Sequence, residues 1–311
     1  MPASPTVSTS PYSSAQFLLE LDGGAATTVR SIEGGKISTE IITYQNNRKP
    51  DEGNYLKQNG KLKYEAIKVV SPLAASKDLW AWMNTFIGGS CQRRNGALVA
   101  ADHEYKEKAR RTFSEALIEE IAFPKFDAND KNPANITVTI QPETLIYQPP
   151  ANGAVIDSQN PALVTSKHVK CCNFTFHFPG APDGFRVTKV DGFSVKAKTI
   201  DYHHAGRLEP IKVPGKLEFP TIAFYVLEPD AAFFINLVGA LRDGKRPEPV
   251  EAWIEFRNSK MDEQGEIRFK YCRVFSASHD KLDASNEDAR VVKVEMAVEG
   301  VTVTAPTPRA K

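Results

Sequence analysis

The chain has few cysteines and almost no net charge. Its 311 residues include four cysteines, Cys91, Cys171, Cys172 and Cys272, which is too few for a disulfide scaffold in a chain of this length. Lys and Arg number 39 and Asp and Glu number 38, and this balance argues against a general nucleic-acid-binding protein, which usually has a strong basic excess. We therefore expect reduced thiols and no broad affinity for nucleic acid.

Long apolar runs are also missing. The longest, such as residues 231–241, are far too short to cross a membrane as a helix. Residues 1–14 are rich in Pro, Ser and Thr and contain no apolar core, which is not typical of a secretory signal peptide. The sequence predicts synthesis in the cytoplasm and no membrane anchor.

None of the common catalytic motifs is present. The chain has no nucleophile elbow, phosphate-binding glycine loop, metalloprotease motif or dinucleotide fingerprint, so we expect neither catalysis nor a cofactor. Two groups raise the alternative of a metal site: His203-His204, and His168 with Cys171-Cys172 and His177. Adjacent side chains diverge, and side chains spread along a strand do not converge on one ion. We therefore expect no metal site.

An internal repeat is the strongest signal in the sequence. Phe17-Leu-Leu-Glu-Leu21 matches Phe174-Thr-Phe-His-Phe178 at an offset of 174 − 17 = 157. Four further blocks follow in the same order at offsets of 155 to 158, and they begin at Ile32 and Val190, Gly60 and Gly215, Lys125 and Lys281, and Ile136 and Val292. This order predicts a tandem duplication. Two unrelated β domains with similar strand patterns remain the alternative.

The repeat divides the chain into two domains. We expect a first domain over residues 16–148 and a second over residues 168–305, joined by a linker over 149–167 that opens with a Pro/Gly/Asn cluster. Residues 1–15 and 306–311 are predicted to be flexible tails.

Each copy is predicted to be mainly β with one short helix. Apolar residues mark strands at equivalent places in both copies. The later predicted strands are residues 97–101, 108–113 and 136–145 in the first copy and 253–257, 267–274 and 291–301 in the second. Helical spacing over residues 76–87 and 229–238 predicts one helix in each. The fold class is therefore two tandem antiparallel β-barrel or sandwich domains, each with its helix over one opening. A parallel βαβ sheet would need several helices in each copy.

Two tryptophans, two arginines and two polar loops are candidates for functional contacts. Trp80 and Trp82 are either a ligand platform or part of a core and a subunit contact, and we favour Trp82 in the core and Trp80 as the contact. Arg93 and Arg94 are either a phosphate site or a solvated or paired turn, and we retain them as subunit-contact candidates. The polar loops after the second strand of each copy, over residues 45–60 and 203–215, are candidates for contacts between rings. Their candidate residues are Arg48, Lys49, Asp51, Glu52, Tyr55, His203, His204 and Arg207.

The first copy resembles the tail tube protein family of contractile-tailed phages and contractile injection systems. The resemblance rests on a Gly-Gly turn after the opening strand, Asp78-Leu-Trp-Ala-Trp82, Arg93-Arg-Asn-Gly-Ala-Leu-Val-Ala-Ala-Asp102, Thr112-Phe-Ser114, and Phe126-Asp-Ala-Asn129 before a closing strand with Glu143. The second copy lacks the Arg-Arg-Asn-Gly turn and the Trp pair. A duplicated chain also differs from the usual single-domain subunit.

This resemblance implies a structural protein that forms six-domain rings, which stack into a hollow tube. A duplicated chain would close such a ring as a trimer with pseudo-sixfold symmetry. The implied partners are further copies of the chain and the sheath, baseplate or spike proteins of the same particle, with DNA or effector cargo passing through the lumen. Assembly would begin in the bacterial cytoplasm and end in a virion tail or an injection particle.

Two alternatives stay open. A trimeric baseplate hub, adaptor or tube-terminating ring would use the same domains in a single ring, and the Pro-containing, shorter loop of the second copy favours this version slightly. A β-sandwich module that binds a ligand or carbohydrate belongs to a different class and needs no ring.

Overall fold

The computed structural model describes residues 16–24, 27–45, 55–73, 77–148, 169–182, 184–203, 205, 209–258, 263–279 and 289–304. The first half contains β1 (Gln16–Leu21), β2 (Thr27–Val29), β3 (Ser31–Gly34), β4 (Ile37–Gln45), β5 (Tyr55–Tyr64), β6 (Ile67–Pro72), α1 (Lys77–Ile87), β7 (Arg94–Ala101), β8 (Glu107–Phe123), β9 (Phe126–Asp127), β10 (Asn135–Gln141) and β11 (Thr144–Gln148). The second half contains β12 (Phe174–His177), β13 (Val187–Val190), β14 (Phe193–Tyr202), β15 (Ile211–Glu218), β16 (Thr221–Leu227), η2 (Glu228–Asp230), α3 (Ala232–Gly239), β17 (Val250–Arg257), β18 (Glu263–His279), β19 (Val291–Ala297) and β20 (Gly300–Thr304).

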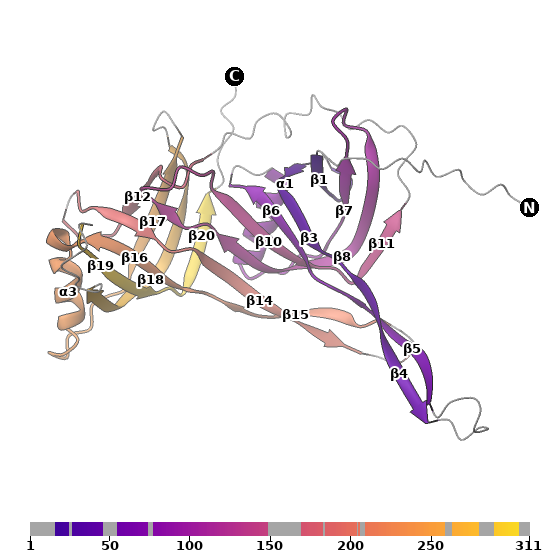
Figure 1. Ribbon diagram of the computed structural model, residues 1–311. Helices are drawn as coiled ribbons and strands as arrows, with labels where there is room; N and C mark the ends of the chain where they lie inside the picture. The colour runs from indigo at the N-terminus through magenta and orange to yellow at the C-terminus, as the bar shows by residue number, and fades with distance from the viewer. Residues whose placement is uncertain are drawn as a thin grey trace, which may run out of the picture.

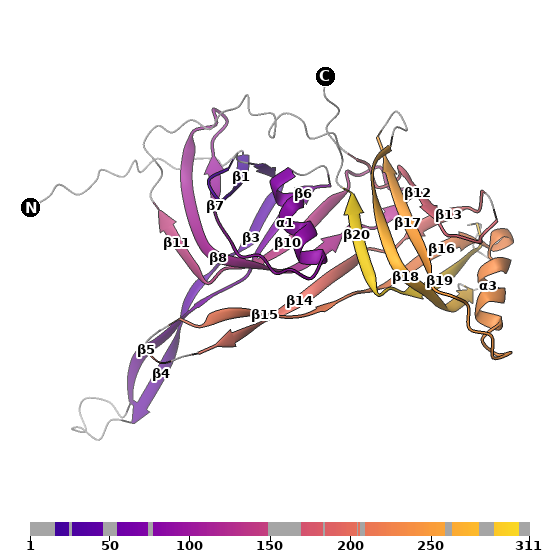
Figure 2. The same cartoon turned by 180° about the vertical axis from the view of Figure 1, so that it is seen from behind.

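The two halves lie side by side, as Figures 1 and 2 show from opposite sides. Every strand pairing among the described residues is antiparallel, as the sequence predicts for a mainly β protein. The hairpin β14–β15 runs from the second half along the first, whereas the hairpin β4–β5 extends out of the first half, away from the second (Figure 1).

The strand pairings of the first half recur in the second with the same register. Thr39 faces Leu62 in β4–β5, and Ala197 faces Leu217 in β14–β15, at offsets of 158 and 155. Val138 faces Val69 in β10–β6, and Val294 faces Phe224 in β19–β16. The same correspondence holds for β1–β7 with β12–β17, β3–β6 with β13–β16, β7–β8 with β17–β18, β8–β10 with β18–β19, and β8–β11 with β18–β20.

Irregularities in the strands recur as well. The long strands β8 and β18 each contain one residue with positive φ, Glu115 at 52° and Tyr271 at 55°, and these two positions are 271 − 115 = 156 residues apart. Residues other than glycine seldom adopt this conformation. Bulges also fall at equivalent points, between Thr39 and Ile41 in β4 and between Ala197 and Thr199 in β14. The two halves therefore share one topology down to the positions of their bulges.

The helices lie close to their predicted places. In α1 the apolar side chains Leu79, Trp82, Met83 and Phe86 are buried on one face. The helix ends at a glycine pair, where Gly89 has φ of 82° and its N–H donates to the carbonyl of Phe86, as glycine commonly does at a helix C-terminus. In the second half the predicted helix over 229–238 is a 3₁₀ turn, η2, followed by α3.

Several strands differ from their predicted bounds. Residues 55–60 and 211–215, predicted as parts of the two polar loops, belong to β5 and β15, because these strands pair with β4 and β14. The predicted single strands over 136–145 and 291–301 are each two strands, since the chain turns at Pro142-Glu143 and at Val298-Glu299. In contrast, β8 and β18 are much longer than predicted, because each bends at its positive-φ residue and serves two sets of partners.

The halves are joined by more than the linker. One apolar core extends through both, and includes Leu79 and Ile121 from the first half and Phe224 and Ile254 from the second. Strands cross between the halves at two places, where β14 pairs with β8 and β13 pairs with β9. The pairing of β14 with β8 is the feature that positions the candidate site.

Candidate assembly interface

The hairpin of the second half completes a sheet of the first. Along the last part of β8, Phe123 faces Phe193, Ile121 faces Val195 and Glu120 faces Lys196. Strand β10 holds the other edge of the same segment. Edge strands expose unpaired N–H and C=O groups, which favour the addition of another strand. We call this contact the internal joint.

Side chains reinforce the internal joint. The rings of Phe123 and Phe193 stack with centroids 4.8 Å apart, and both side chains are buried. Lys196 Nζ lies 3.1 Å from Glu120 Oε1. Next to this ion pair, the Thr199 hydroxyl donates to the carboxylate of Glu119. The joint is therefore apolar at one end and polar at the other.

A buried carboxylate fixes β15 to the first half. Glu143, only 4% exposed, accepts a hydrogen bond from the backbone N–H of Lys212 at 3.0 Å and another from Arg93. The guanidinium of Arg93 also donates to the carbonyl of Lys212. Hydrogen bonds between charged groups are roughly twice as strong as neutral ones, so this group acts as a clamp. We call it the Arg93 clamp.

The equivalent hairpin of the first half has no such support. Strands β4 and β5 pair only with each other among the described residues. Large apolar side chains on this hairpin are exposed, including Ile41 at 65% and Tyr55 at 65%. A two-stranded sheet with exposed apolar residues is marginal on its own, so the hairpin is built like a segment that needs a partner.

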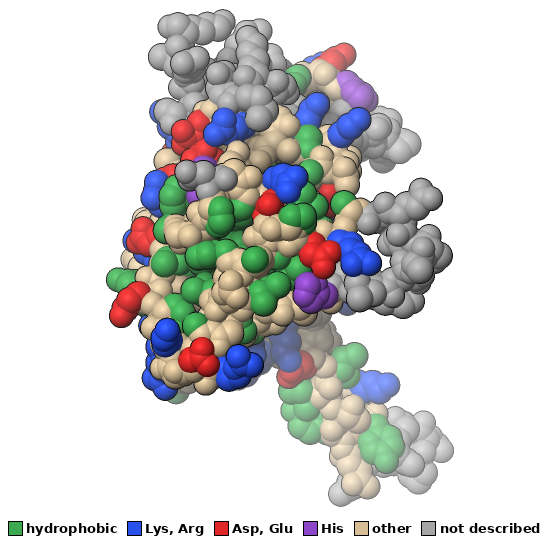
Figure 3. Space-filling view, turned by 90° about the vertical axis from the view of Figure 1, so that its left-hand side faces the viewer, with side chains coloured by type: hydrophobic (Ala, Val, Ile, Leu, Met, Phe, Trp, Pro, Cys, Tyr) green, Lys and Arg blue, Asp and Glu red, His purple; other side chains and the backbone are tan. Residues whose placement is uncertain are grey.

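The second half offers the matching edge. The last part of β18, residues 276–279, corresponds at an offset of 156 to the segment of β8 that binds β14. It pairs with β19 on one side. Among the described residues no strand pairs with its other side. The exposed Phe275, at 48%, lies next to this edge. Figure 3 shows the face of the second half that points away from the first, on which many hydrophobic side chains gather.

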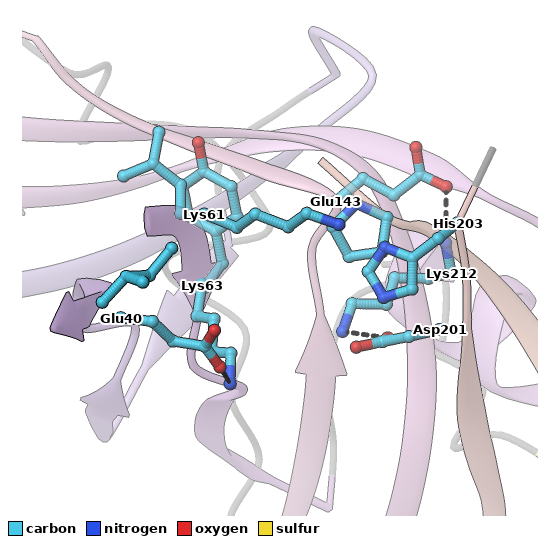
Figure 4. A pocket seen from close by; sticks show the side chains of 11 residues that line it. Glu40, Lys61, Lys63, Glu143, Asp201, His203 and Lys212 are labelled. Atoms are coloured by element: carbon cyan, nitrogen blue, oxygen red, sulfur yellow. Dashed lines mark hydrogen bonds and ion pairs between the residues drawn. The ribbon is translucent and has the colours of Figure 1, made fainter. Parts of the chain in front are cut away.

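A crevice lies between the two hairpins (Figure 4). Its volume is about 460 Å³, and it is lined by Glu40, Ile42, Lys61, Leu62, Lys63, Tyr64, Glu143, Asp201, His203, Pro210 and Lys212. Its acidic groups are paired. Lys63 binds Glu40 and lowers the pKa of that carboxyl, and Lys212 Nζ lies 2.6 Å from Asp201. The Tyr64 hydroxyl donates to Glu209 Oε1 at 2.9 Å across the halves. The crevice is thus a largely polar contact region between the hairpins β4–β5 and β14–β15.

The predicted loop residues fall in different places. Tyr55 begins β5 at the far end of the free hairpin, and His203 lines the crevice. Arg48, Lys49, Asp51, Glu52, His204 and Arg207 lie outside the described residues. Their predicted role in contacts between rings stays a prediction.

The tryptophans and arginines are placed clearly. Trp80, favoured above as a subunit contact, is 2% exposed and donates through Nε1 to the carbonyl of Leu73. It offers a partner almost no surface and takes no part in the interface proposed below. Trp82 is in the core, as expected. Arg93 forms the Arg93 clamp with Glu143 and Lys212, and Arg94 pairs with Asp22 at 3.1 Å.

In the part of the chain that the structure describes, no group of three or more His, Cys, Asp or Glu side chains is placed to hold a metal ion. His177, part of one group considered above, stacks instead on Trp253 with centroids 4.8 Å apart. None of the described helices is long and apolar enough to cross a membrane.

Sequence reasoning missed the residues that shape the joint. Glu119, Thr199 and Phe275 belong to no recognisable motif. The repeat alone could have found them, because it aligns Glu119 with Phe275 and Thr199 with Ile41. Their importance depends on which strand edge is filled, which only the structure shows.

A known protein family is similar to the first half of the chain. Residues 13–146 match the profile of the family described as "T4-like virus tail tube protein gp19". The first half is therefore similar to the tail tube proteins of this family. The family's description names a component of a virus tail tube and no enzymatic activity. The match covers less than half of the chain and stops before the second half.

Solved structures from contractile injection systems are also similar to part of the chain. In "PVC sheath-tube complex in extended state", one chain is 18% identical, with a TM-score of 0.40 over 47% of this chain and 99% of that chain. A chain of "PVC sheath/tube terminator in extended state" is 19% identical, with a TM-score of 0.39 over 45% and 97%. A chain of the "anti-feeding prophage cap" is 16% identical, with 0.39 over 48% and 98%. No curated protein matches this sequence.

Proposed function

We propose that this chain is a duplicated tail tube subunit, and that three copies close a ring of six equivalent domains. In this proposal the second half is a second tube domain, although the family profile matches only the first. Each chain supplies two domains that are already joined through its internal joint. Three further joints between chains then complete the ring with true threefold and pseudo-sixfold symmetry.

The proposal is supported by a difference in strand pairing between the two halves. The hairpin β14–β15 occupies the edge of β8, whereas the equivalent hairpin β4–β5 and the equivalent edge of β18 have no partner among the described residues. The free hairpin is at one end of the molecule and the free edge belongs to the other half (Figure 1). Donor and acceptor on opposite parts of one chain favour head-to-tail assembly, which ends when the ring closes.

The internal joint also predicts the register of the joint between chains. Moving its pairs by the repeat offsets places Gly35 opposite His279, Ile37 opposite Ala277 and Ser38 opposite Ser276 of the neighbouring copy. The corresponding pair inside the chain, Val195 and Ile121, is fully buried. The partly exposed Ile37 and Ala277 would be covered in the same way.

In the particle, the rings would line a tube inside a virion tail or an injection apparatus. The family assignment of the first half supports this location. Sheath, baseplate and terminator proteins are the expected neighbours, and cargo would pass through the lumen. The distal parts of both hairpins, with Tyr44 and Tyr202 exposed at equivalent positions, are candidates for contact with an adjacent ring.

Light scattering combined with electron microscopy of the purified protein tests the proposal. A mass of three chains, with ring-shaped particles, is the expected result. Stacks of rings would favour a bulk tube protein, and single rings would favour a hub, adaptor or terminating ring. A monomer at all accessible concentrations would overturn the ring and favour the alternative of a β-sandwich binding module.

A further inference from the structure

The internal joint and the joint between chains differ in chemistry at one equivalent position. Inside the chain, the hydroxyl of Thr199 on the hairpin meets the carboxylate of Glu119 on the acceptor strand. The equivalent residues for the joint between chains are Ile41 on the hairpin and Phe275 on the acceptor strand. The bulge at the same point of β4 and β14 fixes this correspondence. A polar pair is therefore replaced by an apolar pair.

Both members of the apolar pair are exposed in the isolated chain. Ile41 is 65% exposed and Phe275 is 48% exposed. Neither is needed for the core of its own half. Large apolar side chains that remain in solvent are favourably buried in a contact, and these two would be buried against each other only in the joint between chains.

We propose that the residues at this position determine which hairpin binds which strand edge, so that the two joints are not interchangeable. We call these residues the pairing code. The proposal rests on the ring described above and adds the residues that select its partners. The surface formed by Phe275 and the free edge of β18 accepts the hairpin with Ile41, from the first half of a second copy. The surface formed by Glu119 and β8 accepts the hairpin with Thr199.

Wrong pairings would take away the hydrogen-bond partners of two partly buried polar groups, Glu119 and Thr199. If a free β4–β5 hairpin displaced β14–β15 from β8, the Ile41 side chain would cover the Glu119 carboxylate and remove its hydrogen bond with Thr199. If the hairpin of the second half bound β18, the Thr199 hydroxyl would face the ring of Phe275. Burying a carboxylate or hydroxyl without a hydrogen bond is costly. Specific interfaces commonly exclude wrong partners in this way.

A neighbouring pair adds to the discrimination. In the internal joint, Lys196 and Glu120 form an ion pair at 3.1 Å. The equivalent residues between chains are Ser38 and Ser276, which carry no charge. A wrong hairpin on β8 would place Ser38 against Glu120 and remove its cation. Two neighbouring positions therefore distinguish the joints. At one, an apolar pair between chains replaces a polar pair inside the chain, and at the other an uncharged pair replaces an ion pair.

The test uses exchange of the coded pair in the full chain. Phe275→Glu places a carboxylate against Ile41 and should raise the concentration for half-maximal ring formation on the order of 100-fold. Adding Ile41→Thr recreates the Thr–Glu pair of the internal joint and should restore ring formation to within about 10-fold of the unmodified chain. Analytical ultracentrifugation across a dilution series measures both values.

The controls separate failure of the code from failure of the ring. Because Phe275 is exposed, the F275E chain should melt at the temperature of the unmodified chain under conditions where neither assembles. Phe275→Leu keeps the position apolar and should change assembly by less than about 10-fold. Rings that form equally well with F275E, or an I41T/F275E chain no better than F275E, would overturn the code while leaving the ring intact. An unmodified chain that never assembles would overturn both.

Discussion

The Arg93 clamp predicts a large effect from a small chemical change. Glu143→Gln keeps the shape of the side chain but removes its charge, and so weakens the bonds to Arg93 and to the Lys212 N–H. A hydrogen bond to a charged group contributes about 1.5–3 kcal/mol, and breaking a fully buried ion pair costs about 3–5 kcal/mol. Arg93 is 29% exposed, and Glu115 lies 3.7 Å from its guanidinium. The expected loss in free energy of unfolding is therefore about 2 kcal/mol.

Denaturant unfolding, followed by tryptophan fluorescence, measures this loss. Trp80 and Trp82 report on the first half and Trp253 on the second. The protein should be dilute enough to be unassembled, since assembly raises apparent stability by mass action. Because the clamp joins the halves, E143Q should also separate the unfolding of the second half from that of the first.

Glu115→Gln is the matched control. It removes the same charge near the same guanidinium, but Glu115 is half-exposed, and such pairs contribute less than about 1 kcal/mol. In a double-mutant cycle, Arg93→Met and Glu143→Gln should show a coupling of about 1.5 kcal/mol. Equal effects of E143Q and E115Q, or no coupling with Arg93, would refute the clamp.

Three further predictions concern single residues. Gly96→Ala should lower stability by about 3 kcal/mol, because its Cβ would lie 2.3 Å from the Glu20 carbonyl oxygen; an unchanged melting temperature would contradict this. Burial raises the pKa of the Cys171 and Cys272 thiols to about 11, so at pH 8 both should stay protonated and react with a thiol reagent only as fast as the protein unfolds. Burial and a hydrogen bond to a carboxylate raise the pKa of the Tyr64 hydroxyl to about 12, so the fold favours its neutral form. Its contribution to the free energy of unfolding is therefore complete below about pH 10 and lost as pH rises through 12. Tyr64→Phe should lower the free energy of unfolding by about 1 kcal/mol at any pH between 6 and 9.

The features set by local pattern were predictable from the sequence. The mainly β fold class and the helix over α1 follow from alternation, helical spacing and the terminal glycine pair. The family of the first half also followed from its motifs, and the family profile bears it out. These features depend on residues near one another in the chain.

The features set by distant pairing were not predictable. Residues 55–60 resemble a polar loop because Lys57, Gln58 and Asn59 follow one another without apolar alternation, yet they form a strand because β4 lies beside them. Trp80 resembled a surface residue by its helical position, but the structure packs it against the core and gives its N–H a carbonyl partner at Leu73. The filling of the β8 edge by β14 depends on residues about 70 apart, and no local signal encodes it.

Disulfide trapping of the predicted register tests the central claim most directly. Ile37→Cys and Ala277→Cys in one chain would place two thiols opposite each other across each joint between chains, as Val195 and Ile121 are inside the chain. The control, Ile37→Cys with Ser278→Cys, shifts one thiol to the other face of the strand, and both chains keep the four native cysteines. On a non-reducing denaturing gel after mild oxidation, we expect linked species that end at three chains, seen only for the opposed pair. No linkage beyond the control, or a ladder that continues past three chains, would contradict a closed ring of three duplicated tube subunits.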